Sequence, residues 1–321
     1  MIQVSSAGES QPITVSGGAV LHTELHHPAP GSSARGSVLV RTPYGLASQR
    51  GLAASLSARG FLCWLQDVRG KHGSSGTFDP YRTEAGDGLT TVRHIRGSAA
   101  HRGPLLLMGS SYGATCALEA ARYCPGAEVD VVVALVPTIG RRETARALDG
   151  SLRVRDRFGW WHQHAFTPRT RPPLDDEQLD ELTRDADEHG PTQAAHRHHE
   201  RLGWPQAQLE AWRAMWQERD VALEERFGAC RAPLLVISGQ QDFFADRAEP
   251  LRAAWGSRTA QQDSTLLTGP WGHTLQGRDP DLGARIDRWI DSRINARLDS
   301  PDTGHQTPGI RHRAPETAPA R

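Results

Sequence analysis

The stretch "PLLLMGSSYGATCALEAA", residues 104–121, joins an apolar run to an alanine-rich helical pattern through two adjacent serines. A strand that runs through Gly-x-Ser-x-Gly into a helix is typical of a nucleophile elbow, a sharp turn that holds a serine above a sheet. The residues two before and two after that serine approach each other closely, so both must be small. For Ser111 they are Gly109 and Gly113, whereas for Ser110 they would be a methionine and a tyrosine. The sequence therefore predicts Ser111 as the nucleophile.

Short, β-branched apolar runs alternate with helical patterns along most of the chain. Continuous apolar runs indicate strands that are buried on both faces, as in a parallel sheet covered by helices. Residues 18–28 differ from these runs because apolar and polar residues alternate along them. This alternation predicts an antiparallel edge strand. The sequence thus predicts an α/β protein with a mostly parallel, doubly wound sheet, the α/β-hydrolase fold. The expected strands are 36–43, 60–67, 104–109, 129–137, 232–239 and 264–270, and the expected helices are 47–58, 84–97, 111–123, 246–256 and 280–297.

The regular alternation breaks in the middle of the chain and again at its end. Residues 140–230 are polar, helical in pattern and rich in tryptophan, with no strand-like run. We expect this segment to form a helical cap inserted between two parts of the hydrolase core, residues 1–139 and 231–297. Residues 298–321 are polar and rich in proline, a composition that predicts a disordered tail.

The composition bears on which partners the protein has. Lys plus Arg number 37, as do Asp plus Glu, so the formal net charge is zero. Nucleic-acid-binding proteins usually show a basic excess, which argues against that class. The four cysteines form no C-x-x-C pair, and we expect free thiols in a reducing cytoplasm. The N-terminus lacks a signal-peptide pattern, and no apolar run approaches the ~20 residues of a membrane helix. We therefore expect a cytoplasmic protein that binds neither nucleic acid nor membrane.

A nucleophilic serine needs a base, and the base needs an orienting acid. In hydrolases with this elbow the acid and then the histidine follow the serine along the chain. "LLVISGQQDFFAD" offers Asp242 just after a strand, and "LLTGPWGHTL" offers His273 after the last strand. Both lie at carboxyl ends of strands, where α/β sheets hold their sites. Asp246 is the alternative acid, although its position is more typical of a helix cap.

Five phrases together resemble one family, the cocaine-esterase-like and X-Pro dipeptidyl-peptidase-like serine hydrolases. They are "LVRTPYG" (39–45), "GFLCWLQDVRG" and "SSGTF" (60–78), "GSSYG" (109–113) and "GPWGH" (269–273). The resemblance covers about residues 18 to 295. Larger members of this family carry a C-terminal β jelly-roll domain, and this sequence shows only the hydrolase core.

The resemblance implies roles for individual residues. Ser111 would be the nucleophile, His273 the base and Asp242 the acid. The Tyr44 hydroxyl and the Tyr112 backbone N–H would form the oxyanion hole, because a phenol can donate a hydrogen bond where negative charge develops. The sequence departs from the family before the acid, where two glutamines replace the usual aromatic pair.

Several other features have a functional and a structural interpretation. One or two cap tryptophans are expected to face the pocket, and we take Trp160, Trp161 and, beside the catalytic histidine, Trp271 as substrate-binding candidates. "HRHHE" (196–200) lacks a third metal ligand, so we interpret it as a solvated helix. In "QDVRG", Asp67 and Arg69 are expected to form a buried ion pair that orders the neighbouring loops.

These observations predict a serine hydrolase that cleaves an acyl or aminoacyl ester or amide, a small molecule, through an acyl-serine intermediate. Neither a metal nor an organic cofactor is expected. An acyltransferase would use the same triad, with an amine or alcohol in place of water. A non-catalytic binding protein on the same fold is the other alternative, although such proteins typically lose a member of the triad.

Overall fold

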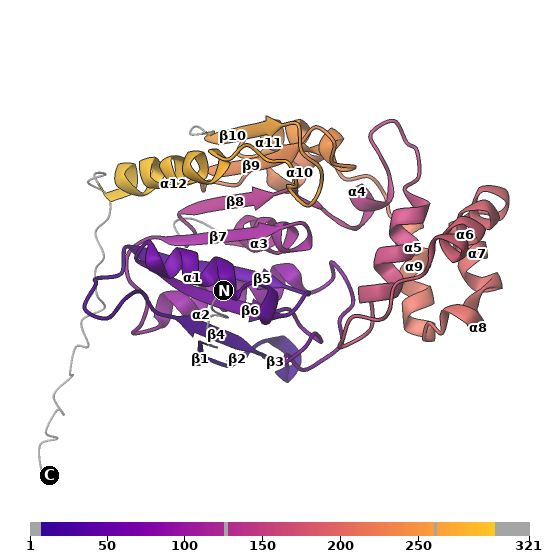
Figure 1. Ribbon diagram of the computed structural model, residues 1–321, viewed down its shortest axis with the longest axis horizontal. Coiled ribbons are helices and arrows are strands. Elements are labelled where there is room, and N and C mark those ends of the chain that lie inside the picture. The colour runs from indigo at the N-terminus through magenta and orange to yellow at the C-terminus, as the bar shows by residue number, and fades with distance from the viewer. Residues whose placement is uncertain (1–7, 125–127, 260–261, 299–321) are drawn as a thin grey trace, which may run out of the picture.

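The computed structural model describes residues 8–124, 128–259 and 262–298. Within them an eight-stranded sheet has the order β1-β4-β6-β5-β7-β8-β9-β10 (Figure 1). Six neighbouring strands, β6, β5, β7, β8, β9 and β10, are parallel to one another. β4 is antiparallel to β6, and β1 is antiparallel to β4. The strands are β1 (Glu9–Ser10), β4 (Thr23–His26), β5 (Gly36–Thr42), β6 (Phe61–Asp67), β7 (Leu105–Ser110), β8 (Val131–Leu135), β9 (Leu234–Gly239) and β10 (Ser264–Gly269).

The parallel strands that the sequence predicts are present, with ends that differ by one or two residues. The edge strand predicted over residues 18–28 is wrong in two respects. The segment divides into β3 (Val20–Leu21), which pairs with β2 (Ile13–Thr14) in a separate small sheet, and β4. β4 is not at the edge, because β1 pairs with its outer side. β1 has two polar residues and no apolar pattern, so nothing in its sequence indicated a strand.

Helices cover both faces of the sheet. On one face, α1 (Arg50–Ala58) and α12 (Leu282–Leu298) contribute to a core that includes Val38 and Val40 of β5. On the other, α2 (Glu84–Gly97), α3 (Tyr112–Tyr123) and α11 (Ala248–Ala254) pack over Leu39 of the same strand. Successive strand residues point to opposite faces, so an unbroken apolar run fills both cores.

The chain between β8 and β9 forms several helices, of which α5 to α9 lie beyond the carboxyl ends of the parallel strands (Figure 1). We call α5 to α9 the cap helices, because they enclose an apolar core of their own that includes Phe158, Trp161 and Trp212. Asp175 begins α6 with a capping box, accepting the Gln178 N–H at 2.8 Å. The segment's helices are α4 (Arg141–Ala145), α5 (Val154–His164), α6 (Asp176–His189), α7 (Pro191–Arg197), α8 (His199–Leu202), α9 (Gln206–Gln217) and α10 (Leu223–Phe227); 3₁₀ turns elsewhere are η1 (Ser16–Gly18), η2 (Leu46–Ser48) and η3 (Ala245–Arg247).

A buried lysine links the sheet to the cap helices. Lys71 Nζ donates to the carbonyl oxygens of His164 at 3.2 Å and Thr167 at 2.9 Å. It also lies 5.4 Å from the ring centroid of Phe78. Burial lowers the pKa of Lys71 to about 8. The Lys71 ammonium group that links the sheet to the cap helices is therefore poorly solvated.

The ion pair expected between Asp67 and Arg69 does not form. Asp67 instead contacts His22 Nδ1 at 3.1 Å and accepts the Gly73 N–H at 3.2 Å. Arg69 reaches α2, where its Nη2 lies 2.5 Å from Asp87 Oδ1. Each of the two charged side chains pairs with a residue from another part of the fold. Tertiary packing determines these pairs, and the local sequence does not indicate them.

The expected helix cap at Asp246 is also wrong. Its carboxylate accepts hydrogen bonds from Arg153 Nη2 at 2.7 Å and from the Leu148 N–H at 2.8 Å. Both donors belong to the segment that leads into α5. Asp246 therefore joins the loop after β9 to the cap helices. The tail predicted at 298–321 lies, beyond Leu298, outside the described residues.

Candidate active site

The turn between β7 and α3 has the geometry of an elbow. Ser111 adopts φ 56° and ψ −121°, a backbone conformation that few non-glycine residues occupy. A Cβ atom at Gly109 would lie 2.1 Å from the carbonyl oxygen of Gly113, and one at Gly113 would lie 2.9 Å from that of Arg41. Gly109 and Gly113 thus approach each other closely, as the assignment of the elbow to Ser111 from the sequence required.

Three side chains from the ends of β7, β9 and β10 form a hydrogen-bonded chain. His273 Nε2 lies 2.8 Å from Ser111 Oγ, and His273 Nδ1 lies 3.0 Å from Asp242 Oδ1. Asp242 is buried and also accepts the Phe244 N–H at 3.0 Å, which fixes the carboxylate in its loop. The structure therefore brings together the three residues that the sequence singled out, in the arrangement of nucleophile, base and orienting acid.

Trp271 does not line the cavity beside these residues, contrary to the expectation. It is 1% exposed and packs in the core on the α1 and α12 face of the sheet. A Cβ at Gly239 would lie 1.9 Å from its carbonyl oxygen, and one at Gly269 would lie 1.9 Å from its ring. Trp271 thus packs against the ends of β9 and β10 and positions the loop that carries His273.

The two adjacent cap tryptophans also have different surroundings. Trp160 lines the cavity, whereas Trp161 is fully buried among the cap helices, so the expectation for Trp161 was wrong. Neighbouring residues on a helix point about 100° apart, because one turn takes about 3.6 residues. Arg157, Trp160 and His164 share the face of α5 toward the cavity. Phe158 and Trp161 share the face toward the cap core.

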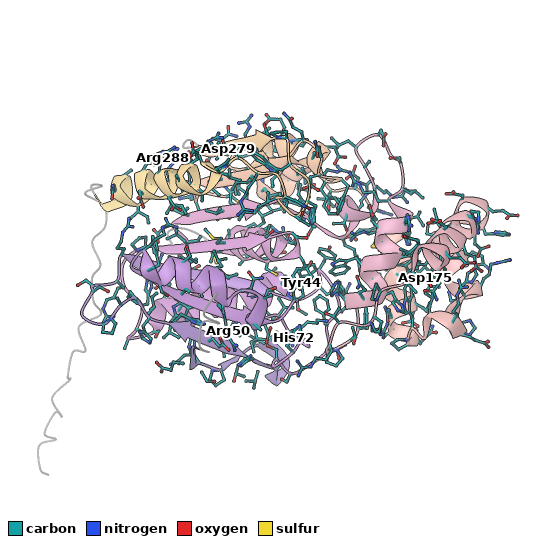
Figure 2. All side chains as sticks on the ribbon, viewed as in Figure 1. Tyr44, Arg50, His72, Asp175, Asp279 and Arg288 are labelled. Carbon is teal, nitrogen blue, oxygen red and sulfur yellow. The ribbon has the colours of Figure 1, made fainter. Side chains whose placement is uncertain are left out.

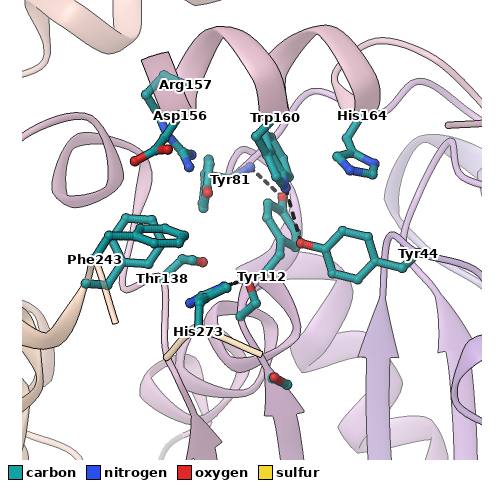
Figure 3. Close-up of a pocket in the computed structure, with 13 residues that line it drawn as sticks. Tyr44, Tyr81, Tyr112, Thr138, Asp156, Arg157, Trp160, His164, Phe243 and His273 are labelled. Atoms are coloured by element: carbon teal, nitrogen blue, oxygen red, sulfur yellow. Dashed lines mark hydrogen bonds between the residues drawn. The ribbon is translucent and has the colours of Figure 1, made fainter. Parts of the chain in front are cut away.

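Tyr44 and Trp160 form a hydrogen bond beside Ser111. The Trp160 Nε1–H donates to the Tyr44 hydroxyl oxygen at 3.2 Å (Figure 3), and Tyr44, Trp160 and Ser111 line the same cavity. Burial raises the pKa of Tyr44, so the phenol keeps its proton at neutral pH. An indole N–H can only donate, so the Tyr44 O–H remains available to donate elsewhere. Tyr44 follows β5, at the end of that strand that faces the cap helices (Figure 2).

Tyr112 is the first residue of α3, and its backbone N–H has no partner within the helix. Its ring is held in place by three contacts. The hydroxyl donates to Glu84 Oε1 and accepts the Tyr81 N–H at 2.8 Å, while the ring stacks on Trp160 at 5.5 Å between centroids. The helix N-terminus and the Tyr44 hydroxyl thus border the same cavity as Ser111.

The cavity above Ser111 has a volume of about 390 Å³ (Figure 3). Its wall combines six aromatic side chains with seven polar or charged ones. Apolar walls with convergent polar groups are common in small-molecule sites. His164 contributes a neutral imidazole, because burial lowers its pKa to about 4. The aromatic wall consists of Tyr44, Tyr81, Tyr112, Trp160, Phe243 and Phe244, and the polar groups besides Ser111 and His273 include Ser110, Thr138, Asp156, Arg157 and His164.

Sequence reasoning missed several of these wall residues. Phe243 and Phe244 lie 4.6 and 5.5 Å from the His273 ring, measured between centroids. Both follow Asp242 directly in the sequence, and this position could have indicated that they lie beside the site. Arg157 was available from helical spacing, since it lies one turn before Trp160. Tyr81 adopts φ 68° in a loop that has no regular pattern, so nothing local indicated its position.

Other site types find little support in the described part of the chain. Within residues 8–124, 128–259 and 262–298, no group of three or more His, Cys, Asp or Glu side chains is arranged to hold a metal ion. In "HRHHE", His196 and His199 are exposed, and His198 pairs with Asp185 at 3.2 Å. The same residues include no helix long and apolar enough to span a membrane.

Residues 17–275 of the sequence match the model of the X-Pro dipeptidyl-peptidase (S15) family. The chain belongs to this family. The resemblance stated from the motifs is thereby confirmed. No curated protein sequence matches the chain significantly.

Solved structures with the same fold include larger and similar-sized hydrolases. An aminopeptidase from a marine sediment Thaumarchaeota archaeon superposes with a TM-score of 0.65 at 18% identity, covering 90% of this chain and 54% of that one. An α-amino acid ester hydrolase gives 0.58 at 19% identity, covering 88% and 52%. The Pyrococcus furiosus esterase Pf2001 gives 0.57 at 14% identity, covering 88% and 90%. The chain thus spans about half the length of the first two, and at these identities the likeness concerns the fold alone.

Proposed function

We propose that this member of the family is a serine hydrolase that cleaves acyl or aminoacyl esters or amides through an acyl-serine intermediate. The observation that carries the proposal is the position of His273, within hydrogen-bonding distance of both Ser111 Oγ and Asp242 Oδ1. A histidine in that position can take the serine proton while the carboxylate stabilises the imidazolium.

In the proposed first half-reaction, Ser111 Oγ attacks the carbonyl carbon of the substrate and its proton moves to His273 Nε2. The carbonyl π electrons move to the oxygen, which accepts hydrogen bonds from the Tyr44 O–H and the Tyr112 N–H. Collapse of this tetrahedral intermediate breaks the bond to the leaving group. His273 donates its proton to that group, which departs as an alcohol or amine.

In the second half-reaction, His273 takes a proton from water as the water oxygen attacks the acyl-serine carbon. The same two donors hold the oxyanion. Its collapse breaks the bond between the acyl carbon and Ser111 Oγ, His273 returns its proton to Oγ, and a carboxylic acid is released. Asp242 keeps the imidazole in the tautomer that has its proton on Nδ1, so that Nε2 can accept. The groups that would contact the reacting atoms border the same cavity, whereas Asp242 lies buried behind His273.

Labelling with a fluorophosphonate probe tests the nucleophile. The wild-type protein should be labelled at one site, Ser111→Ala should lose both labelling and ester hydrolysis, and Ser110→Ala should remain labelled because His273 pairs with Ser111. A panel of short-chain esters, aminoacyl esters and aminoacyl anilides then defines the acyl and leaving groups. Undiminished labelling of Ser111→Ala, or no labelling of the wild type, would contradict the proposal.

A further inference from the structure

Arg157 places a buried guanidinium in the wall of the cavity. It lies on α5, and its side chain is 4% exposed. In Figure 3 it lies on the cap side of the cavity, opposite His273. Its Cζ atom is 5.7 Å from the ring centroid of Trp160 and 5.6 Å from that of Phe244. A cation and two aromatic side chains therefore meet across from the reacting serine.

The guanidinium lacks a carboxylate partner among the described residues. No described carboxylate oxygen lies within 4 Å of its nitrogens, and its Nε has no hydrogen-bond partner there. The neighbouring Tyr81 hydroxyl is a neutral hydrogen-bonding group, and burial lowers the pKa of Arg157. Taking a charge out of water without pairing it is unfavourable.

Arg226 shows how the same protein treats a buried arginine with a structural role. Its Nη1 lies 2.8 Å from Glu143 Oε1, and its Nη2 lies 3.1 Å from Glu119 Oε1. Burial acts against this cation too, but the two carboxylates outweigh it and the pKa of Arg226 is raised. Arg157 has the burial without the carboxylates.

Asp156 precedes Arg157 and also borders the cavity, but it does not neutralise the cation. Its side chain is exposed, and the two residues form no ion pair within 4 Å. Water screens the field of an exposed charge much more than that of a buried one. The charge of Asp156 favours the cation only at a distance, so the cap side of the cavity retains a positive charge that forms no ion pair among the described residues.

We propose that Arg157 binds a carboxylate of the substrate, so that the preferred ester or amide carries a free carboxylate group. This inference rests on the proposed function for the position of the scissile bond. A guanidinium presents parallel N–H groups that match the two oxygens of a carboxylate. The adjoining faces of Trp160 and Phe244 would contact the apolar chain between that carboxylate and the scissile carbonyl.

Two pairs of esters test the inference and distinguish where the carboxylate lies. 4-Nitrophenyl hydrogen glutarate and its neutral methyl ester place it on the acyl group. 4-Acetoxybenzoate and its methyl ester place it on the leaving group. The wild type should favour the anionic member of one pair. Arg157→Met should lower kcat/KM for that ester by about 10- to 100-fold, as loss of a hydrogen bond to a charged group implies, and should spare its neutral partner.

Variants on the same helix provide the controls. Arg157→Lys should keep part of the preference, because an ammonium retains the charge without the fork of donors. Arg155→Met should leave both esters unchanged, since Arg155 pairs instead with Asp176 at 2.7 Å. Equal losses on the anionic and neutral esters in Arg157→Met, or a wild type without any preference, would overturn the inference.

A binding measurement separates this inference from the proposed function. Monomethyl glutarate is titrated calorimetrically into Ser111→Ala and into Ser111→Ala/Arg157→Met. Binding to the first that is lost in the second supports the anion site, even if the wild type hydrolyses none of the esters and the proposed function fails. Absence of binding to the first, in a wild type that hydrolyses neutral esters and prefers neither anionic ester, overturns the anion site and leaves the function standing.

Discussion

The two sides of the cavity are held in place in different ways. On the sheet side, Ser111, Asp242 and His273 follow three strands whose positions are set by the backbone hydrogen bonds of the sheet. On the cap side, Arg157 and Trp160 lie on one helix that is positioned by the cap core and by a few links to the sheet. We infer that the strand ends determine the positions of the three proposed catalytic side chains. The orientation of α5 determines which substrate groups fit beside them.

The two aspartates after β9 allow the largest test of this difference. Asp242→Asn should remain folded but lose about 10⁴ in kcat, the loss reported for an orienting acid whose replacement leaves histidine in the wrong tautomer. Asp246→Asn should stay active, because Asp246 pairs with Arg153 and contributes to holding the cap segment. Steady-state kinetics and thermal melts of both variants decide the matter, and the reverse pattern would move the acid to Asp246.

The proposed oxyanion hole should show the next largest effect. Tyr44→Phe removes one hydroxyl and leaves the ring in place, so folding should be little changed. Loss of one donor to the oxyanion typically lowers kcat by about 10²- to 10³-fold. A variant whose kcat stays close to that of the wild type would mean that Tyr44 serves only to pack the cavity wall.

Much of the sheet side could be predicted from the sequence, because its constraints are local. The small residues around Ser111 follow from the sterics of the turn, and the order of Asp242 and His273 follows from their positions after buried strands. The pairing of Asp67 and Arg69 could not be predicted. Each of these charges contacts a residue more than ten positions away, and several distant partners were compatible with the same motif.

On the cap side, the composition predicted helices but left their orientation open. The position of Trp160 depends on how α5 packs against the other cap helices, which is a tertiary property. Helical spacing alone would have shown that Trp160 and Trp161 point in different directions. It would not have shown which of them faces the cavity.

The adjacent tryptophans therefore give a matched pair of variants. Trp160→Phe removes the N–H that donates to Tyr44. An ordinary hydrogen bond contributes about 1 kcal/mol, so kcat should fall by roughly fivefold. Trp161→Phe removes only buried ring volume, because its own Nε1 has no hydrogen-bond partner among the described residues. That variant should retain kcat and lose stability by about 1–2 kcal/mol. Kinetics and urea denaturation of both should show opposite patterns, and equal effects on activity would refute the assignment of faces.

The last expected effect is on stability alone and concerns Lys71, which joins the two sides. Burial lowers its pKa to about 8 in the folded protein, whereas an unfolded lysine titrates at about 10.4. Below pH 8 both states carry the proton, and the folded state bears the full unfavourable effect of burying the charge. Between these values the unfolded chain binds more protons, so the free energy of unfolding should rise with pH.

Lys71→Met removes this contribution, because methionine does not titrate. Urea denaturation of the wild type and the variant at pH 7 and at pH 9.5 should therefore show a difference in unfolding free energy that moves in favour of the wild type at the higher pH. Burial raises the pKa of the four cysteines, which opposes the trend, but that effect is common to both proteins and cancels in the difference. Lys71 is the only lysine in the sequence, so no other amine of this type obscures the comparison. A difference that is independent of pH would show that Lys71 keeps an ordinary pKa and that the link between sheet and cap is well solvated.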